Sequence, residues 1–196
     1  MDLHQYVLRG KVIHQMTDDE FYQFCTDNPE LRLERNEHQE IIIMSPTGTT
    51  SGFNSSECFG QLYLWNKQTK LGKTFDSSTG FLLPDGSVRS PDAAWVSNTQ
   101  WKQLTAEQKK KFAPLCPVFV IEVKSESDNL TDLQKKMQMW ISNGCLLAFL
   151  IDPELKQSFI YAKNTAVEQI RGFDKQLSGG TVLPGFELDL SELEEV

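Results

Sequence analysis

Two runs of apolar residues separated by a helical pattern form the clearest feature of the sequence. Residues 117–123 are almost continuously apolar and rich in β-branched and aromatic side chains, which predicts a central strand buried on both faces. Residues 145–151 form a second such run, and between the two runs apolar residues recur at helical spacing over residues 130–141. A strand, an amphipathic helix and a strand in this order predict a βαβ unit whose strands are parallel neighbours.

Two further helices are predicted in the first half of the chain. Thr17 and Glu20 stand three residues apart, which is the spacing of a capping box at the start of a helix. A longer helix is expected to begin after caps at residues 49–51 and to end near Lys70. The apolar face of that helix is expected to contain Cys58, Leu62 and Trp65, widened by Phe59 and Leu64.

The remaining apolar segments predict strands. Two hairpins are expected, one pairing residues 31–34 with 40–44 and the other pairing 158–162 with 166–170. Strands over residues 74–83 and 89–96 are expected to be hinged by the turn Pro84-Asp85-Gly86. The whole pattern predicts one α/β domain over residues 1–196, with a core at about 16–190. Its mixed β-sheet, flanked by helices, is expected to be antiparallel before the central strand and parallel after it.

Charge and composition narrow the possible functions. The 196 residues carry a formal net charge of −8, which argues against holding nucleic acid by bulk electrostatics, since phosphate neutralisation takes Lys and Arg. An enzyme whose acidic cleft is completed by a divalent cation remains compatible with this charge. No apolar run reaches the roughly 18 residues of a membrane span, and the first residues lack a signal-peptide core, so a cytoplasmic location is expected. The four dispersed cysteines and three early histidines show no zinc-ligand spacing.

The central strand, although predicted to be buried, ends in two charged residues. Glu122 and Lys124 are two positions apart, so they point to the same face of the strand. A buried carboxylate or ammonium is costly unless it is paired or holds a metal, and an ordinary salt bridge at a strand end is one explanation. The other depends on Asp92, which follows Pro91 and precedes the apolar segment 93–96. Taken alone, such a Pro-Asp pair is most often a turn or a helix cap.

If the two strands are adjacent, Asp92 and Glu122 meet at one edge of the sheet with Lys124 beside them. Carboxylates are the hard oxygen ligands that Mg²⁺ takes, and a bound cation lowers the pKa of a bound water and neutralises charge on a phosphoryl oxygen. Lys124 would orient the attacking water or stabilise the same charge. This set suffices for phosphodiester hydrolysis without His or Cys. The hypothesis requires the three side chains to converge, rather than to face apart or to join unrelated ion pairs.

The order Pro-Asp, then Glu-x-Lys at the end of a buried strand, resembles the PD-(D/E)XK motif of restriction-endonuclease-like nucleases. A longer series of segments is similar to the Uma-two family of endonucleases, which is common in cyanobacteria. The likeness spans roughly residues 16–190 and rests on MSPTG, TGFLLPDGSVRSPDAAWVS, PVFVIEVKSESDNLTDLQKKMQMWISNG, LIDP and LPGF. It implies a restriction-endonuclease-like core, a Mg²⁺ (or Mn²⁺) site, DNA as the substrate and a homodimer.

The resemblance also assigns roles to single residues. Asp92 and Glu122 would bind the metal, and Lys124 would serve the attacking water. Glu57, on the helix before the core, matches an acidic residue that such nucleases often add as a further metal ligand. A solvated helix carboxylate is the alternative explanation for Glu57.

Two positions on the helix after the motif carry weaker implications. Lys136 matches a lysine often present there and would contact a phosphate of the nucleic acid, although one member of a Lys135-Lys136 pair on a polar face is more often simply solvated. Trp140 stands where family members often have Tyr, so the role of a hydroxyl there does not carry over. Tryptophans at such positions are more often part of the core than platforms for bases.

Three functions follow from these observations. The first is a Mg²⁺-dependent DNA endonuclease that uses the PD…ExK residues. The second is a catalytically silent, nuclease-like homodimer that acts as a binding or regulatory scaffold, which the net charge of −8 favours. The third is a metal-dependent hydrolase of another phosphate ester.

Overall fold

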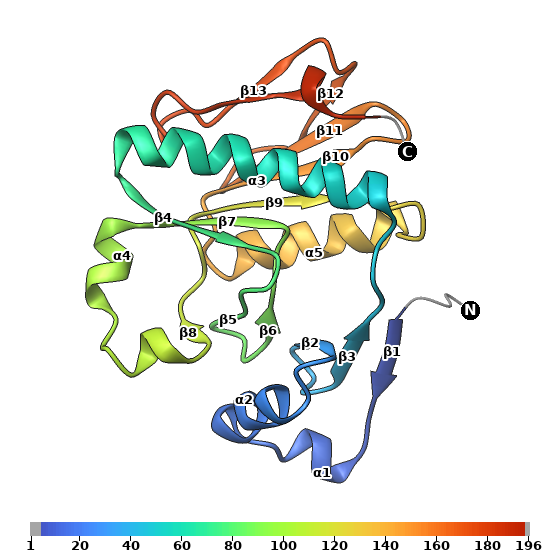
Figure 1. Cartoon of the computed structure of the whole chain (residues 1–196), viewed down its shortest axis with the longest axis vertical. Coiled ribbons are helices and arrows are strands. Elements are labelled where there is room, and N and C mark those ends of the chain that lie inside the picture. Colours follow the sequence, from blue (N-terminus) through green and yellow to red (C-terminus); the bar gives the residue numbers. More distant parts are fainter. Residues whose placement is uncertain (1–4, 195–196) are drawn as a thin grey trace. The chain divides into compact units, whose positions relative to one another are not determined.

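The structure, a computed structural model, describes residues 5–194, which divide into two compact units (Figure 1). The first unit is formed by the described part of Met1–Pro46 together with Ser78–Ser90 and Leu104–Cys116. The second unit contains Thr47–Ser77, Pro91–Gln103 and the described part of Pro117–Val196. Each unit is built on its own six-stranded sheet. The expectation of a single domain over the whole chain stays a prediction.

The second unit is organised around a mixed sheet with the order β12-β11-β10-β9-β7-β4. β9 (Phe119–Val123) and β10 (Leu147–Asp152) are parallel neighbours joined through helix α5 (Leu130–Ser142), which confirms the predicted βαβ unit. The other neighbouring pairs in this sheet are antiparallel. Its remaining strands are β4 (Gly72–Asp76), β7 (Ala93–Ser97), β11 (Gln157–Ala162) and β12 (Glu168–Arg171).

Different elements cover the two faces of this sheet. Helix α3 and a two-stranded hairpin pack on one face, where Phe119, Ile121 and Val123 of β9 point. The intervening residue Glu122 points to the other face and contacts α5. Besides α5, the elements of this unit that lie outside the six-stranded sheet are α3 (Thr49–Thr69), α4 (Asn98–Gln103), β13 (Gln176–Ser178), β14 (Glu187–Asp189) and the 3₁₀ turn η2 (Leu190–Glu192).

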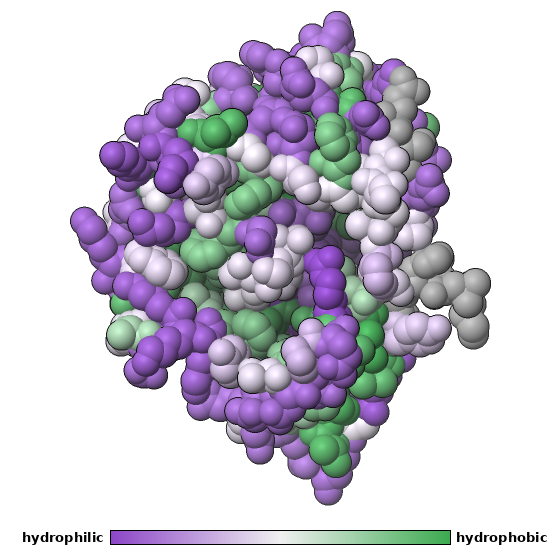
Figure 2. All heavy atoms as spheres, viewed as in Figure 1, coloured by the Kyte–Doolittle hydropathy of each residue, from purple (hydrophilic) through white to green (hydrophobic). Residues whose placement is uncertain are grey.

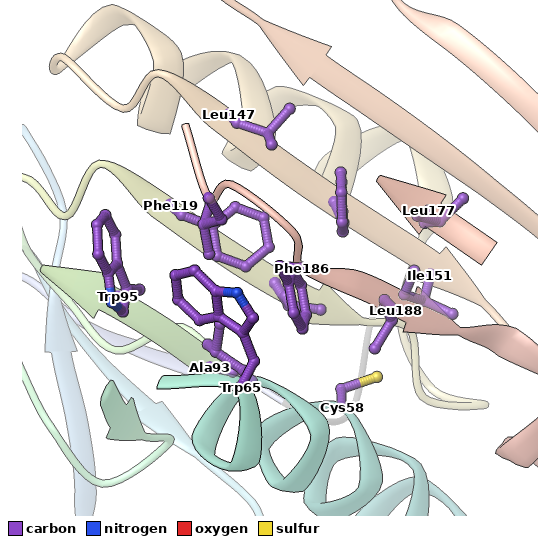
Figure 3. Packing of buried hydrophobic residues seen from close by; sticks show 14 of the residues in the cluster. Cys58, Trp65, Ala93, Trp95, Phe119, Leu147, Ile151, Leu177, Phe186 and Leu188 are labelled. Carbon is purple, nitrogen blue, oxygen red and sulfur yellow. The ribbon is translucent and has the colours of Figure 1, made fainter. Parts of the chain in front are cut away.

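Aromatic rings fill the core between α3 and the sheet (Figure 3). The ring of Phe186 lies 5.7 Å from that of Trp65 and 5.8 Å from that of Phe119, between centroids. Cys58 and Trp65 of α3 are buried, as the helical pattern predicted. Leu64 is 61% exposed, so its predicted place on the apolar face is wrong. Leu64 precedes the buried Trp65 by one residue. It therefore lies about 100° around the helix from Trp65, on the side that faces solvent.

The first unit has a sheet with the order β1-β3-β2-β6-β5-β8. The predicted capping box opens α2, because Thr17 Oγ1 accepts from the Glu20 N–H and Glu20 Oε2 accepts from the Thr17 N–H. Figure 2 shows hydrophobic side chains at the surface over β1 and α1, where Val12 is exposed. The elements are β1 (Gln5–Leu8), α1 (Lys11–His14), α2 (Asp18–Asp27), β2 (Arg32–Arg35), β3 (Ile41–Met44), β5 (Phe81–Leu82), β6 (Val88–Arg89), η1 (Gln108–Lys110) and β8 (Ala113–Pro114).

The strands predicted over residues 74–83 and 89–96 are each divided between the two sheets. β4 ends at Asp76 and the chain re-forms a strand at β5, while β6 ends at Arg89 and the chain re-enters a strand at β7. The polar, glycine-containing segment 77–80 interrupts the first strand, and Pro91, which has no N–H for a ladder, interrupts the second. The turn at residues 84–86 is confirmed as the link between β5 and β6. Strands expected in one sheet therefore lie in two.

Gly72, at the start of β4, occupies a position with no room for a side chain. A Cβ atom there would lie 2.5 Å from the indole of Trp95 and closer still to the carbonyl oxygen of Val96. Asn66 fixes the same junction, because its Oδ1 accepts from the Gly72 N–H (3.1 Å) and from Trp95 Nε1–H (2.9 Å). We expect Gly72→Ala to lower the free energy of unfolding by about 1–3 kcal/mol in urea denaturation.

Gly60→Ala is the matched control for this prediction. Gly60 lies inside α3, and a Cβ atom there meets nothing within 4 Å. Alanine is the better helix former, so this variant is expected to gain about 0.5–1 kcal/mol of stability. Two variants of equal stability would contradict the close approach at Gly72.

Candidate functional site

The candidate site lies at the carboxyl end of β9, a fully buried strand in the middle of the second unit's sheet. Every residue of β9 is buried, and the Lys124 N–H extends its ladder by donating to the carbonyl oxygen of Ile151 on β10 at 2.8 Å. Alternation along the strand turns Glu122 and Lys124 away from the aromatic core and toward the face that carries α5. Two charged side chains, Glu122 and Lys124, are therefore buried at this end of the strand.

Glu122 is held by two donors from α5. Its Oε1 accepts from the indole Nε1–H of Trp140 at 2.9 Å, and the Lys136 ammonium lies 2.9 Å from Oε1 and 3.0 Å from Oε2. Lys136 and Trp140 are four residues apart, so one helical face presents both donors to the strand. The predicted core position of Trp140 is confirmed, whereas the solvated alternative for Lys136 is wrong, because its side chain is only 18% exposed.

Asp92 lies beside Glu122 at the same edge of the sheet. β7 and β9 are antiparallel with Ala93 opposite Ile121, so the register carried one step further sets residue 92 opposite residue 122. The Asp92 Oδ2 accepts from the backbone N–H of Val123 at 2.8 Å, which anchors this carboxylate to the end of β9. The alternative in which the Pro-Asp pair serves only as a turn or a helix cap does not include this contact with a distant strand.

Lys124 forms an ion pair that sequence reasoning missed. Its Nζ lies 2.6 Å from Oε2 of Glu154 and 3.2 Å from the carbonyl oxygen of Ser125, and its side chain is buried. Glu154 follows the end of β10, the parallel neighbour of β9, and its side chain is about half exposed. Since parallel strands end at the same edge of a sheet, an acidic residue just after the second strand was the signal available in the sequence.

Glu57 approaches the same region from α3. Its side chain is half-buried, and its Oε1 accepts from Gln61 Nε2 at 3.3 Å, one turn further along the helix. The neighbouring Cys58 thiol reports on this arrangement. Burial raises the pKa of Cys58, and the negative charges of Asp92 and then Glu57 raise it further. The role of Glu57 as a metal ligand and its alternative as a solvated helix carboxylate both stay predictions.

The donor set suits a hard divalent cation better than a transition metal with soft ligands. Asp92, Glu122 and Glu57 offer carboxylate oxygens only, and the buried thiol of Cys58 has a raised pKa that disfavours the thiolate a soft metal needs. A cation already lies against Glu122 in the form of the Lys136 ammonium. Within residues 5–194, no three His, Cys, Asp or Glu side chains lie close enough together to hold a metal ion, so the structure does not gather Glu57, Asp92 and Glu122 into one such group.

The first unit has a cavity of about 400 Å³ that none of the predicted site residues lines. Its acidic groups are occupied within the unit, since Asp18 pairs with Arg35 and Asp19 pairs with Lys111 at 2.7 Å. Its apolar walls come from Tyr22, Leu82, Val88, Phe112 and Pro114. The chemistry indicated by the sequence therefore lies in the second unit.

Among the helices of residues 5–194, each is too short or too polar to cross a lipid bilayer.

Comparison with known proteins adds three findings. The Uma2 family, described as "Putative restriction endonuclease", matches residues 18–191. A solved structure, described as that of "a putative nuclease belonging to DUF820 from Anabaena variabilis", is similar with a TM-score of 0.69 and 20% sequence identity, covering 83% of this chain and 89% of that chain. This likeness confirms the predicted α/β, restriction-endonuclease-like fold class. No curated protein matches the sequence.

Proposed function

Because this chain belongs to the Uma2 family, we propose that it is a Mg²⁺- or Mn²⁺-dependent DNA endonuclease that hydrolyses phosphodiester bonds at the end of β9. The observation that supports the proposal is the hydrogen bond from the Val123 N–H to Asp92, which holds this carboxylate at the end of β9, one residue after Glu122. An isolated salt bridge at the strand end would not require this second carboxylate.

Asp92 and Glu122 are the residues that would hold the cation, with Glu57 as a further ligand from α3. The cation, when bound, supplies a water of lowered pKa and neutralises charge on the phosphoryl oxygens. The backbone N–H of Val123 fixes Asp92, and the indole of Trp140 fixes one oxygen of Glu122. Ligands whose orientation is set by such surrounding donors lose little freedom when they bind a cation.

Lys124 is the group that would meet the attacking water or the scissile phosphate. Its ammonium has three donors, and contacts to Glu154 and the Ser125 carbonyl use two of them. The carboxylate of Glu154 compensates the positive charge of this buried lysine by a direct ion pair. A positive donor held in that place stabilises negative charge that develops on the phosphate during hydrolysis.

A homodimer is part of the proposal, since two copies of one site can each cut one strand of a duplex. The net charge of −8 means that DNA binding depends on local cations rather than on the protein's overall field. Light scattering of the purified chain measures the assembly directly.

The second candidate is a nuclease-like scaffold without hydrolysis. The specific observation in its favour is that Glu122 and Lys124 each have a partner within the chain, Lys136 and Glu154, so both charges are compensated without a metal. Calorimetric titration with Mn²⁺ separates the two functions, because the scaffold predicts no heat of binding that depends on Asp92 and Glu122.

A cleavage assay tests the proposed function. Supercoiled plasmid incubated with the protein and Mg²⁺ or Mn²⁺ is expected to be nicked or linearised, and chelation of the metal with EDTA is expected to stop the reaction. A panel of single-stranded, double-stranded and branched DNA, with simple phosphate esters beside it, identifies the substrate. Cleavage that continues unchanged in EDTA would refute the metal-dependent mechanism.

A further inference from the structure

Two adjacent lysines on α5 lie in opposite environments. The Lys135 side chain is 72% exposed and pairs with the exposed Asp132 on its own helix, at 2.7 Å. The Lys136 ammonium instead lies within 3.0 Å of both oxygens of the buried Glu122. The sequence pair therefore contains one surface lysine and one lysine committed to the candidate site.

The Lys136 ammonium occupies the position in which a divalent cation would bind both oxygens of Glu122. Each carboxylate oxygen has two lone pairs, and Trp140 already takes one of those on Oε1. The Lys136 ammonium takes the second lone pair of Oε1 and one of Oε2, so at most one lone pair of Oε2 is left for a cation while the ammonium stays. Lys136 and a divalent cation therefore cannot both hold this carboxylate in the same way.

The burial of Glu122 explains why Lys136 lies against it. A buried carboxylate is strongly destabilising when its counter-charge is removed. Glu122 is 4% exposed and therefore needs a positive partner whenever no metal is bound. The neutral indole of Trp140 orients the carboxylate but cannot compensate its charge.

We propose that Lys136 is a built-in counter-ion of Glu122 that competes with the divalent cation and gives way to it. Lys136 thus stabilises the metal-free site and lowers its affinity for metal. Trp140 keeps its hydrogen bond to Glu122 in both states and so preserves the carboxylate's orientation during the exchange. This inference rests on the proposed function, because it concerns the same metal site.

Calorimetric titration with Mn²⁺, in the absence of DNA, tests the competition. The variants are Lys136→Met, which removes the charge and keeps most of the side-chain length, and Lys135→Met as the matched control. Lys136→Met is expected to bind Mn²⁺ roughly tenfold or more tightly than the unaltered protein, since a charge-assisted contact no longer competes. Lys135→Met is expected to bind within about twofold of the unaltered protein, because exposed pairs contribute little.

A second variant covers the case in which Lys136→Met does not fold. Lys136→Gln keeps a neutral donor for Glu122 and is also expected to bind Mn²⁺ more tightly than the unaltered protein. Equal or weaker binding by the folded Lys136 variants would overturn the inference and leave the metal site standing. No metal binding by any protein, the unaltered chain included, would overturn both the inference and the proposed function.

Discussion

Asp92→Asn is expected to slow metal-dependent DNA cleavage by about a thousandfold or more while leaving the fold intact. The substitution removes the negative charge that would hold the cation, and loss of several kcal/mol of transition-state stabilisation corresponds to this factor. Asparagine keeps an amide oxygen that can still accept from the Val123 N–H, so the junction between β7 and β9 is retained. Single-turnover plasmid cleavage measures the rate, and circular dichroism with thermal unfolding measures the fold.

Asp132→Asn is the matched control for this prediction. Asp132 lies in the first turn of α5, is exposed, and pairs only with the exposed Lys135 among the ion pairs of residues 5–194. It loses the same charge in the same chemical change, so a rate near that of the unaltered protein is expected. If Asp92→Asn cleaved DNA at full rate with metal present, the assignment of this carboxylate to the metal would be wrong.

The βαβ unit was predictable because its signals are local. The apolar run of β9 and the helical spacing of α5 are properties of consecutive residues. The Asn129 side chain caps α5 by accepting from two backbone N–H groups, and Gly144, with φ of 108°, ends it in a conformation that glycine favours. Each of these features can be read without knowing what the unit packs against.

The division of the strands between two sheets was not predictable in the same way. Apolar alternation shows that residues 72–76 and 81–82 prefer extended backbone, but it does not say which strand each will pair with. Partner choice depends on contacts distant in sequence, such as β5 pairing with β8 some thirty residues later. The polar segment 77–80 was the only local sign that the first strand would stop.

The candidate site shows the same contrast between local and distant information. The spacing of Glu122 and Lys124 gave their shared face, and the Pro-Asp pair gave Asp92, because these are properties of short segments. Their partners Lys136 and Glu154 come from other elements, and the contacts depend on the side-chain conformations and the packing of those elements. The helix of a βαβ unit packs on one face of its strands, and in this protein it covers the face to which Glu122 points. The spacing of Lys136 and Trp140, four residues apart on that helix, was therefore the sequence signal that both could contact Glu122.

Trp140→Ala is expected to lower the free energy of unfolding by about 3–5 kcal/mol, the largest loss of stability expected for a residue of the site. Trp140 is fully buried and is the largest such side chain among residues 5–194, so truncation opens a cavity beneath α5. The same change removes the indole donor from Glu122, whose buried carboxylate then relies on Lys136 alone. Urea denaturation, with the midpoint and slope compared with those of the unaltered protein, measures the loss.

Trp140→Phe separates the two causes of that loss. Phenylalanine keeps most of the ring in the core and removes only the N–H, so a smaller loss of about 1–3 kcal/mol is expected. Trp101→Ala is the control for removing a tryptophan, because Trp101 is only partly buried on α4 and packs against Phe75. If Trp140→Ala cost no more than Trp101→Ala, the buried contact with Glu122 would not stabilise the fold. Its role in orienting the carboxylate would then lose its physical basis.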